Sequence, residues 1–448
     1  MSTKLTILLL FTLINGLAWV AVIPFAGFPD GAPDEIHHFE VTRFIGATGR
    51  VPIFGPDADL YIRVRPGAED TINNRIYGWH ALFPLGAYIL PGLFIHVLPE
   101  LSLAHQVLAA RLFSVLSLLC LVYFAYRIAV LLFDDGFLHL GIPLFVSLVP
   151  QITFIGAYHN PDASTIAATT AAMYFALKMF IDDSFILKDA LGLGLALSFV
   201  AMMKQHGWLT SALFVGMSAL WTLFRRPKVL WQWMLVAAPL PLLVFGSWFL
   251  MQWLRYGDIF GQEVFLQAWM SDRPFLVSLA EQGFTLVDFF LHTNWLVMTF
   301  KSFWGMFGYM SVEFSPAIYW GLALLCIGGF VGLLLGIIRR WNRHAFDDKQ
   351  LTFQALIIFA VTIGILFAAA VYTSYYQDYQ PQGRYLLPVI VPVVTFILLG
   401  WRELLRPVNL WSVGIRLLGT GLILLNFVSL VFYVIPGMWW SVDEQWFF

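Results

Sequence analysis

The chain has 448 residues, of which 60% are hydrophobic and only 12% charged, and its formal net charge at pH 7 is -2. Charged residues make up about a quarter of a soluble domain, so this composition excludes an ordinary soluble protein and indicates one that crosses a membrane several times. The small net charge and the lack of a basic stripe also argue against a nucleic-acid partner.

Apolar segments of about 20 residues, the length that a helix needs to cross the hydrocarbon core, recur along the chain. They are 5–22, 103–133, 137–155, 164–181, 190–203, 209–224, 229–254, 317–338, 351–371, 385–401 and 413–434. The sequence therefore predicts an all-α polytopic membrane protein with about eleven transmembrane helices, in one membrane domain that covers residues 1–448. We expect the first segment to be retained as a span, because no convincing cleavage site follows it.

The orientation is predicted from the basic loops, which concentrate on the cytoplasmic side of a membrane. Segment 81–98 is apolar but is interrupted by two prolines and two glycines. If the N-terminus is cytoplasmic and 81–98 does not cross, the basic clusters that follow residues 224, 338 and 401 are all cytoplasmic. We therefore expect 81–98 to be an interfacial or re-entrant helix, between two large external loops at about 23–102 and 255–316.

The first of these loops contains an unusually polar stretch directly after the first apolar segment. Its ionisable residues are Asp34, Glu35, His37, His38 and Glu40. Acids in a first helical turn are often only complements to the helix dipole, but a cap does not need two histidines, and ionisable residues at a membrane boundary are usually functional. Adjacent helical residues point about 100° apart, so we expect only one of Asp34 and Glu35 to face a site. Asp34 and His38 are also candidate ligands of a divalent cation, although adjacent histidines seldom face one metal.

Three further polar groups are predicted at the external ends of later helices, where they could bind a substrate. They are Asn160 and Asp162, then Lys204 and His206, and finally Gln382, Arg384 and Tyr385. Alternatively, Asn-Pro-Asp is a good turn with Asp162 as a helix cap, and Lys204 could simply extend its head group to water. Arg384 is the most distinctive, because a helix start disfavours a cation whereas an arginine fork suits a bidentate phosphate.

Two other features have competing interpretations. Arg111, early in the second span, could reach the external face or could pack against a carbonyl of a neighbouring helix. Segment 302–309 alternates aromatic residues with glycines, and we interpret it as tight core packing.

Several motifs, taken together in chain order, resemble a bacterial family of predicted membrane proteins, domain of unknown function 2142. These motifs are Pro33-Asp34-Glu35 with His38, Asn160-Pro161-Asp162, Tyr256-Gly257-Asp258, Ser302-Phe303-Trp304-Gly305 with Phe307-Gly308, and Gln382-Gly383-Arg384-Tyr385. More broadly, the acidic pair in the first external loop and the basic residues at outer helix ends look like the GT-C glycosyltransferases. Segment 77–84 departs from the aromatic segment that often follows that loop in GT-C enzymes, which leaves the acceptor undefined.

The GT-C resemblance implies an inverting sugar transfer at the external face of the cytoplasmic (inner) membrane, in the assembly of cell-envelope polysaccharides or glycolipids. The donor would be a polyprenyl-phosphate sugar, and the acceptor a glycan, a lipid or a protein. Asp34 or Glu35 would be the base or a metal ligand, while Arg384 and Lys204 would hold the lipid phosphate. His37, His38 and Glu40 could orient the acid or bind sugar hydroxyls.

Two other functions stay open. A lipid-linked saccharide transporter, or flippase, is expected to show polar residues near the bilayer midplane and paired broken helices in repeated halves, whereas the predicted polar residues collect at one face. A non-catalytic protein of polysaccharide assembly has no distinguishing pattern in the sequence.

Overall fold

A computed structural model describes residues 2–26, 31–57, 79–261, 263–264, 266–267, 277–342 and 350–439. Tyr77 and Gly78, the first two residues of segment 77–84, lie outside these residues. The described part is almost entirely helical, and its one sheet is a pair of two-residue antiparallel strands, β1 (Met306–Phe307) and β2 (Val312–Glu313).

The helices of the first half begin with α1 (Thr3–Val22), α2 (Glu35–Thr48), the 3-10 turn η3 (Trp79–Leu82) and α3 (Gly86–Val97). There follow α4 (Leu103–Leu132), α5 (Gly136–Leu148), α6 (Pro150–Ala157), α7 (Pro161–Ile181), α8 (Leu187–Ala201), α9 (Gln205–Arg225), α10 (Pro227–Ala237) and α11 (Pro239–Tyr256).

The second half contains α13 (Leu286–His292), α14 (Trp295–Trp304), the two strands, α15 (Pro316–Asn342) and α16 (Gln350–Tyr376). It ends with η5 (Gly383–Val389), α17 (Ile390–Leu405), η6 (Arg406–Val408), α18 (Trp411–Val428), the π-helical turn η7 (Ser429–Val434) and α19 (Ile435–Trp439).

Eight helices among the described residues are long and apolar enough to cross a membrane, or up to ten if two bent pairs each count as one span. The pairs are α5 with α6, bent by 61°, and α10 with α11, bent by 49°. In each pair a proline starts the second helix, because proline suits a first helical position but cannot continue a preceding helix. The chain is thus an all-α, multi-pass membrane protein.

Among the described residues the predicted count of about eleven spans is not confirmed, and the difference is segment 190–203. This segment belongs to α8, whose 15 residues are fewer than the roughly 20 of a typical crossing helix. Helix α8 still runs from one end of α7 to the other, because Lys178 near the end of α7 pairs with Asp189 in the first turn of α8, and Lys204 just after α8 pairs with Asp162 at the start of α7. Segment 81–98 forms η3 and the 12-residue α3, which is shorter than a crossing helix; its interfacial or re-entrant position stays a prediction.

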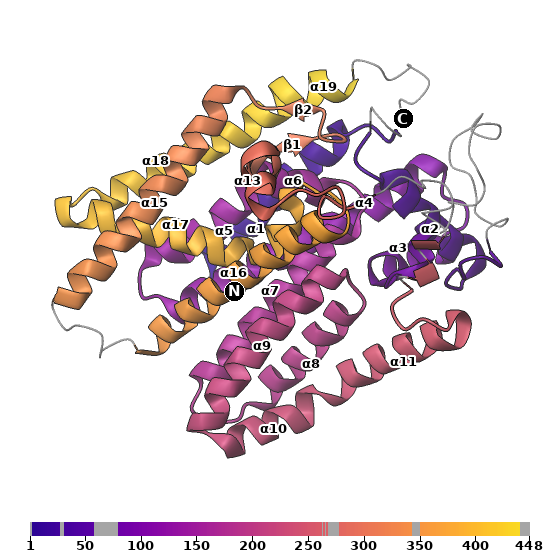
Figure 1. The fold of residues 1–448 in the computed structure, drawn as a ribbon, viewed down its shortest axis with the longest axis horizontal. Helices are drawn as coiled ribbons and strands as arrows, with labels where there is room; N and C mark the ends of the chain where they lie inside the picture. The colour runs from indigo at the N-terminus through magenta and orange to yellow at the C-terminus, as the bar shows by residue number, and fades with distance from the viewer. Residues whose placement is uncertain are drawn as a thin grey trace.

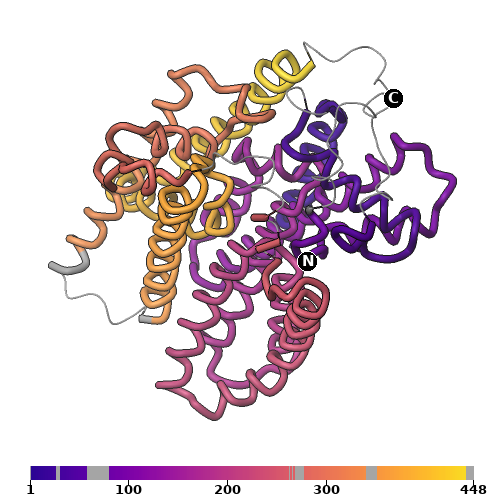
Figure 2. The backbone as a smooth tube through the Cα atoms, turned by 45° about the vertical axis from the view of Figure 1, so that its right-hand side comes forward, coloured from indigo at the N-terminus to yellow at the C-terminus, as the bar shows by residue number. Residues whose placement is uncertain are grey.

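Helices α7–α11 form one group and α15–α18 another, with α2 and α3 together on a third side (Figures 1 and 2). The most buried candidate spans are α7 and η5–α17, with 72% of each apolar window inside the protein. Glycines allow close approach between helices: a Cβ added at Gly332 of α15 would collide with the backbone of Gly400 in α17. Trp304 and Phe307 are fully buried, so segment 302–309 packs in the core, as predicted.

Candidate functional site

Six segments that are far apart in the sequence meet at one end of the helix bundle. The backbone N–H of His159, in the turn before α7, donates to Glu35 of α2 at 2.8 Å, and Lys204, before α9, pairs with Asp162 of α7 at 2.7 Å. Burial and the charges of Asp162 and Asp34 raise the pKa of the Tyr158 hydroxyl, against the opposing charge of Arg384. We call this group the polar cluster; it comprises Asp34, Glu35, His37, His38, His80, Tyr158, His159, Asp162, Lys204, His206, Tyr309 and Arg384.

Glu35 is fully buried, and both of its carboxylate oxygens already accept hydrogen bonds. Arg111 of α4 donates to them from Nε at 2.8 Å and from Nη2 at 2.6 Å, and the His159 N–H is a third donor. Arg111 also donates from Nη1 to the carbonyls of Val20 and Ile23 at the end of α1. Glu35 therefore joins α2 to α4, and the carbonyl contact expected of Arg111 is confirmed. Both oxygens of this buried carboxylate are thus engaged within the fold.

Asp34 has the opposite environment, although it is the adjacent residue. It stands at the N-cap position of α2 in the left-handed region, with φ 59°, and its side chain makes no capping bond. A positive φ is uncommon outside glycine but is tolerated by aspartate, and strain of this kind concentrates at functional sites. The Tyr309 hydroxyl accepts the Asp34 backbone N–H at 3.1 Å, which supports this conformation.

The Asp34 carboxylate itself is only half-buried, and within the described residues no hydrogen bond or ion pair engages it. The charge of Asp34 can still complement the positive end of the α2 dipole. Its side chain, however, does not cap the helix. Of the two acids, only Asp34 has oxygen lone pairs available to a ligand.

Both histidines of α2, His37 and His38, contact the ring of His80 in η3. His38 Nδ1 lies 2.8 Å from the Tyr88 hydroxyl, and the His38 ring makes an edge contact with His80 at 4.6 Å between centroids. Burial lowers the pKa of both His38 and His80, and the charge of Lys204 lowers each further. These two imidazoles are therefore neutral near pH 7.

His37 differs from its neighbour because it is the more exposed, with 43% of its side chain accessible, and lies 3.7 Å from Glu40. Burial opposes protonation, but the hydrogen bond and charge of Glu40, together with the charge of Asp34, raise the pKa of His37. His37 is thus the histidine of α2 that readily carries a proton beside Asp34.

The turn before α7 has two acidic or amide residues with different tasks. The Asn160 side chain accepts the N–H groups of Asp162 and Ala163 and donates to the carbonyls of Ile155 and Tyr158. The alternative that Asp162 caps the helix is wrong, because Asn160 is the cap, and the backbone uses its amide completely. Asp162 is left to interact with side chains.

Asp162 is a buried acceptor surrounded by cations and an imidazole. Lys204 Nζ lies 2.7 Å from its Oδ1, and His206 Nε2 lies 4.0 Å from the same oxygen. The Lys204 side chain remains 28% exposed, so this lysine pairs with Asp162 instead of only extending to water. The His206 Nε2 is buried without a hydrogen-bond partner among the described residues.

Arg384 is positioned by the tight packing of η5 on α14. Gly383 donates its N–H to Ser302 Oγ at 2.8 Å, and a Cβ at Gly383 would collide with the backbone of Thr299 and Phe303. Arg384 then lies over the Tyr385 ring, 5.4 Å from its centroid, and its buried Nε has no hydrogen-bond partner in the described part of the chain.

The other two residues of this motif lie beside Arg384 but contact different partners. The Tyr385 ring makes an edge contact with His206 at 5.9 Å, and Gln382 donates to Gln380 Oε1 at 2.8 Å. Tyr385 thus packs against the polar cluster, whereas Gln382 makes its hydrogen bond within its own loop.

The described residues contain no group of three or more His, Cys, Asp and Glu side chains that could hold a metal ion. The candidate ligands Asp34 and His38 lie in the same cluster, but His38 Nδ1 already contacts Tyr88. The donor set that the described structure offers is therefore incomplete for a divalent cation.

Sequence reasoning did not identify His80, Tyr88 and Tyr309 as members of the site. Tyr88 lies in an interrupted apolar segment and Tyr309 ends a packing motif, so neither has a local signal. His80 could have been found as a histidine in an otherwise aromatic segment of the same external loop.

Several solved structures are similar to this chain at low sequence identity. One is ArnT from Cupriavidus metallidurans bound to undecaprenyl phosphate, with 14% identity, a TM-score of 0.47 and coverage of 97% of this chain and 73% of that one. Another is the oligosaccharyltransferase of Archaeoglobus fulgidus in the apo form, with 12% identity, a TM-score of 0.45 and coverage of 96% of this chain and 55% of that one.

A third structure is the archaeal oligosaccharyltransferase AglB from Archaeoglobus fulgidus, in complex with an inhibitory peptide and a dolichol-phosphate, with 11% identity and a TM-score of 0.45. It covers 99% of this chain, which spans 57% of the AglB chain. Likeness at this level carries no conclusion about activity.

No curated protein matches the sequence. The model of a family described as predicted membrane protein (DUF2142) matches residues 77–393, well over half of the chain. This match confirms the resemblance that the motifs indicated, and the chain belongs to the DUF2142 family of predicted membrane proteins.

Proposed function

We propose that this protein is an inverting membrane glycosyltransferase, which moves a sugar from a polyprenyl-phosphate donor to an acceptor hydroxyl. The observation that carries the proposal is the presence of two groups in one cluster: the Asp34 carboxylate, which makes no hydrogen bond among the described residues, and the buried Arg384 Nε, which has no hydrogen-bond partner there. The charges of both residues act on the same hydroxyl, that of Tyr158. A carboxylate open to a proton and a guanidinium N–H open to a phosphate are the groups that such a transfer uses.

In the proposed reaction, the acceptor oxygen attacks the anomeric carbon of the sugar and loses its proton to Asp34. The bond between that carbon and the phosphate oxygen breaks, and its electron pair stays on the phosphate. Arg384 and Lys204 stabilise the charge that develops there. A phosphate is already a good leaving group, so the step needs no general acid.

The remaining members of the polar cluster take positioning roles in this proposal. Glu35 holds the start of α2 through Arg111 and does not react. The neutral His38 and His80 line the site, and the more exposed His37, paired with Glu40, is suited to a sugar hydroxyl. Tyr385 and His206 form an aromatic wall beside Arg384.

The proposed site faces the outside of the cytoplasmic membrane. Arg225, Arg339 and Arg402, which lie in the last turns or at the ends of α9, α15 and α17, are placed in the cytoplasm by the predicted topology. The polar cluster lies near the opposite ends of these spans, before α9 and at the start of η5. An acceptor from the cell envelope would reach it there.

The proposal is tested by incubating the purified protein with a panel of polyprenyl-phosphate sugars and an extract of envelope glycans and lipids. Mass spectrometry then scores the release of free polyprenyl phosphate. Asp34→Asn should lower the rate by about 10²–10⁴-fold without lowering the unfolding temperature, because asparagine also tolerates the left-handed conformation. Glu100→Gln, at an exposed carboxylate of the same predicted loop, is the control and should keep the wild-type rate.

An unchanged rate in Asp34→Asn removes Asp34 from the mechanism. If no sugar donor releases lipid phosphate with the wild-type protein, the second candidate function is a lipid-linked saccharide transporter. The two bent helix pairs favour that candidate, and movement of an intact donor across vesicles would identify it.

A further inference from the structure

A cavity of about 1130 Å³ lies at the other end of the bundle and contains no residue of the polar cluster. Leu132, the last residue of α4, lines it, whereas Arg111 near the start of α4 binds Glu35. These two positions are 21 residues apart in one helix, roughly 30 Å at ~1.5 Å per residue. The cavity is therefore separate from the proposed active site by about the thickness of a membrane.

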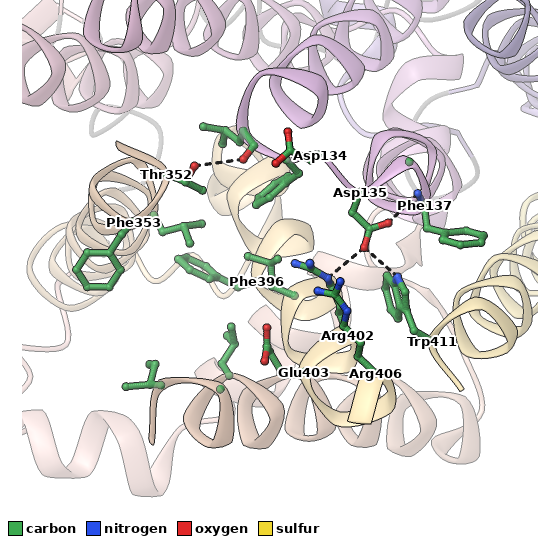
Figure 3. Close-up of a pocket in the computed structure, with 18 of the residues that line it drawn as sticks. Asp134, Asp135, Phe137, Thr352, Phe353, Phe396, Arg402, Glu403, Arg406 and Trp411 are labelled. Carbon is green, nitrogen blue, oxygen red and sulfur yellow. Dashed lines mark hydrogen bonds and ion pairs between the residues drawn. The ribbon is translucent and has the colours of Figure 1, made fainter. Parts of the chain in front are cut away.

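One wall of the cavity is a built polar corner, labelled in Figure 3. Asp135 Oδ2 accepts from Trp411 Nε1 at 3.2 Å and lies 3.1 Å from Arg402 Nε, while Asp135 Oδ1 accepts the Phe137 N–H at 3.0 Å. The charge of the Asp135 carboxylate is thus balanced by the Arg402 guanidinium. Groups at the ends of α5, α17 and α18 hold this carboxylate in place. It fixes the Arg402 guanidinium at the edge of the cavity.

Arg406 adds a second guanidinium beside the first. It follows Arg402 by four residues, so the two share one side of the chain at the end of α17, and Figure 3 shows them next to each other. Arg406 is exposed, and no ion pair or side-chain hydrogen bond involves it within the described residues; the same holds for Lys4, which also lines the cavity. This rim offers two unengaged cations to an anion.

Three polar residues, Asp134, Thr352 and Glu403, also line the cavity, and both of these acids interact with other residues. Lys4 and Arg406 are thus the lining cations that have no described ion pair.

The remaining lining is mostly apolar and includes Leu356, Phe396 and Leu399. Ile337 of α15 and Phe353 of α16 also line the cavity, yet 53% and 43% of these residues are exposed. The cavity therefore combines two unengaged cations with an apolar slot that reaches the exposed, lipid-facing sides of α15 and α16.

We propose that this cavity binds an anionic phospholipid of the surrounding leaflet. The phosphate of its head group contacts Arg406, and its acyl chains lie in the slot between α15, α16 and α17. By the predicted topology this end is cytoplasmic, where anionic lipids attract basic pockets between transmembrane helices. The inference does not rest on the glycosyltransferase proposal, because none of these residues is in the polar cluster.

The test measures lipid binding to the purified full chain by native mass spectrometry. The probes are phosphatidylglycerol, phosphatidylcholine with the same acyl chains, and glycerol phosphate, which has the anionic head group without the chains. Arg406→Gln removes a rim cation that has no described ion pair, and Ala360→Trp fills the apolar slot. Matched controls are Arg225→Gln, at the exposed last turn of α9, and Ala368→Trp, on α16 outside the cavity.

Phosphatidylglycerol should bind more tightly than phosphatidylcholine and glycerol phosphate. Arg406→Gln should weaken phosphatidylglycerol binding about fivefold, the equivalent of about 1 kcal/mol for one basic residue near an anionic surface. Ala360→Trp should abolish it, and both control variants should bind as the wild type does.

Three outcomes overturn the proposal. Equal affinity for the two lipids excludes recognition of the anionic head group, and unchanged binding in both Arg406→Gln and Ala360→Trp excludes this cavity. Glycerol phosphate that binds as tightly as phosphatidylglycerol would show that the site takes a free phosphate compound instead of a lipid. Unfolding temperatures of all variants separate loss of binding from loss of fold.

Discussion

The pair Glu35–Arg111 and the group around Asp162 are two buried arrangements of charge at the same end of the bundle, and they differ in how completely their hydrogen bonds are made. Arg111 donates hydrogen bonds to Glu35 and to two backbone carbonyls. Around Asp162, by contrast, His206 Nε2 and Arg384 Nε are buried and have no hydrogen-bond partner among the described residues.

A buried polar atom without a partner is costly, typically about 1–3 kcal/mol. A ligand that supplies the missing hydrogen bond removes this cost, whereas an ion pair whose hydrogen bonds are all made within the protein stabilises the fold. The difference teaches that burial of a charge does not by itself mark a functional residue. The state of its hydrogen bonds separates Glu35, which holds α2 on α4, from Arg384, whose buried Nε has no hydrogen-bond partner among the described residues and for which we propose a phosphate.

The largest effect is expected from breaking the closed pair. Glu35→Gln leaves the Arg111 cation buried with no carboxylate, and loss of one partner of such a pair costs about 3–5 kcal/mol. The double variant Glu35→Gln with Arg111→Met should recover part of this loss. Lys204→Met should cost less, because the lysine is partly exposed and His206 and Arg384 still act on Asp162.

These stabilities are compared by thermal unfolding of the purified variants in one detergent. A Glu35→Gln protein as stable as the wild type would contradict the structural role of the pair. A Lys204→Met loss larger than that of Glu35→Gln would reverse the comparison between the two regions.

The next effect concerns the open group. Arg384→Gln should weaken binding of a polyprenyl phosphate by about 10- to 100-fold, because a charge-assisted hydrogen bond contributes about 1.5–3 kcal/mol. Titration with the lipid phosphate measures this, and Gln382→Ala is the control, since Gln382 bonds to Gln380. Equal affinity of the Arg384 variant and the wild type would refute phosphate binding by this arginine.

A distinct effect, smaller when counted per pH unit, is expected on the free energy of unfolding when the pH is lowered. Burial lowers the pKa of His159 to about 3, and the His159 Nε2 lies 2.7 Å from the Thr42 hydroxyl. Between pH ~6.5 and that value the unfolded chain takes up a proton that the folded chain does not, so stability falls as the pH falls. The slope is about 1.4 kcal/mol per pH unit for each such histidine.

His38 and His80 contribute in the same direction, whereas the raised pKa of His37 opposes them. His159→Gln should therefore make unfolding less sensitive to acid over this range than it is in the wild type. Denaturant titrations at several pH values measure the slope, and an identical slope in the variant would show that His159 is not held neutral.

The smallest effect is expected at the contact that supports Asp34. Tyr309→Phe removes the hydroxyl that accepts the Asp34 N–H, and a single hydrogen bond contributes about 0.5–1.5 kcal/mol. The variant should keep its fold and lose transfer activity by severalfold, because Asp34 is less firmly placed. Wild-type activity with a lowered unfolding temperature would mean that the contact serves stability alone.

Local patterns in the sequence were sufficient for the membrane character, for most of the helices and for the neighbourhood of the site. The length and apolarity of a segment decide whether it can cross a bilayer, so α1, α4, α7 and α15 were predicted within a few residues. The topology then placed the segments around Asp34, Asp162, Lys204 and Arg384 at one end, and the structure brings them together.

The division of roles within those segments was decided only by tertiary structure. Asp34 and Glu35 are adjacent acids with the same chemistry, and what separates them is a guanidinium 76 positions away, a backbone N–H 124 positions away and a left-handed turn. For the same kind of reason, the cap of α7 is Asn160 and not Asp162, which pairs with Lys204. Apolarity adds up along a segment and can be predicted from it, but the partner of a charged group depends on which distant segments fold against it.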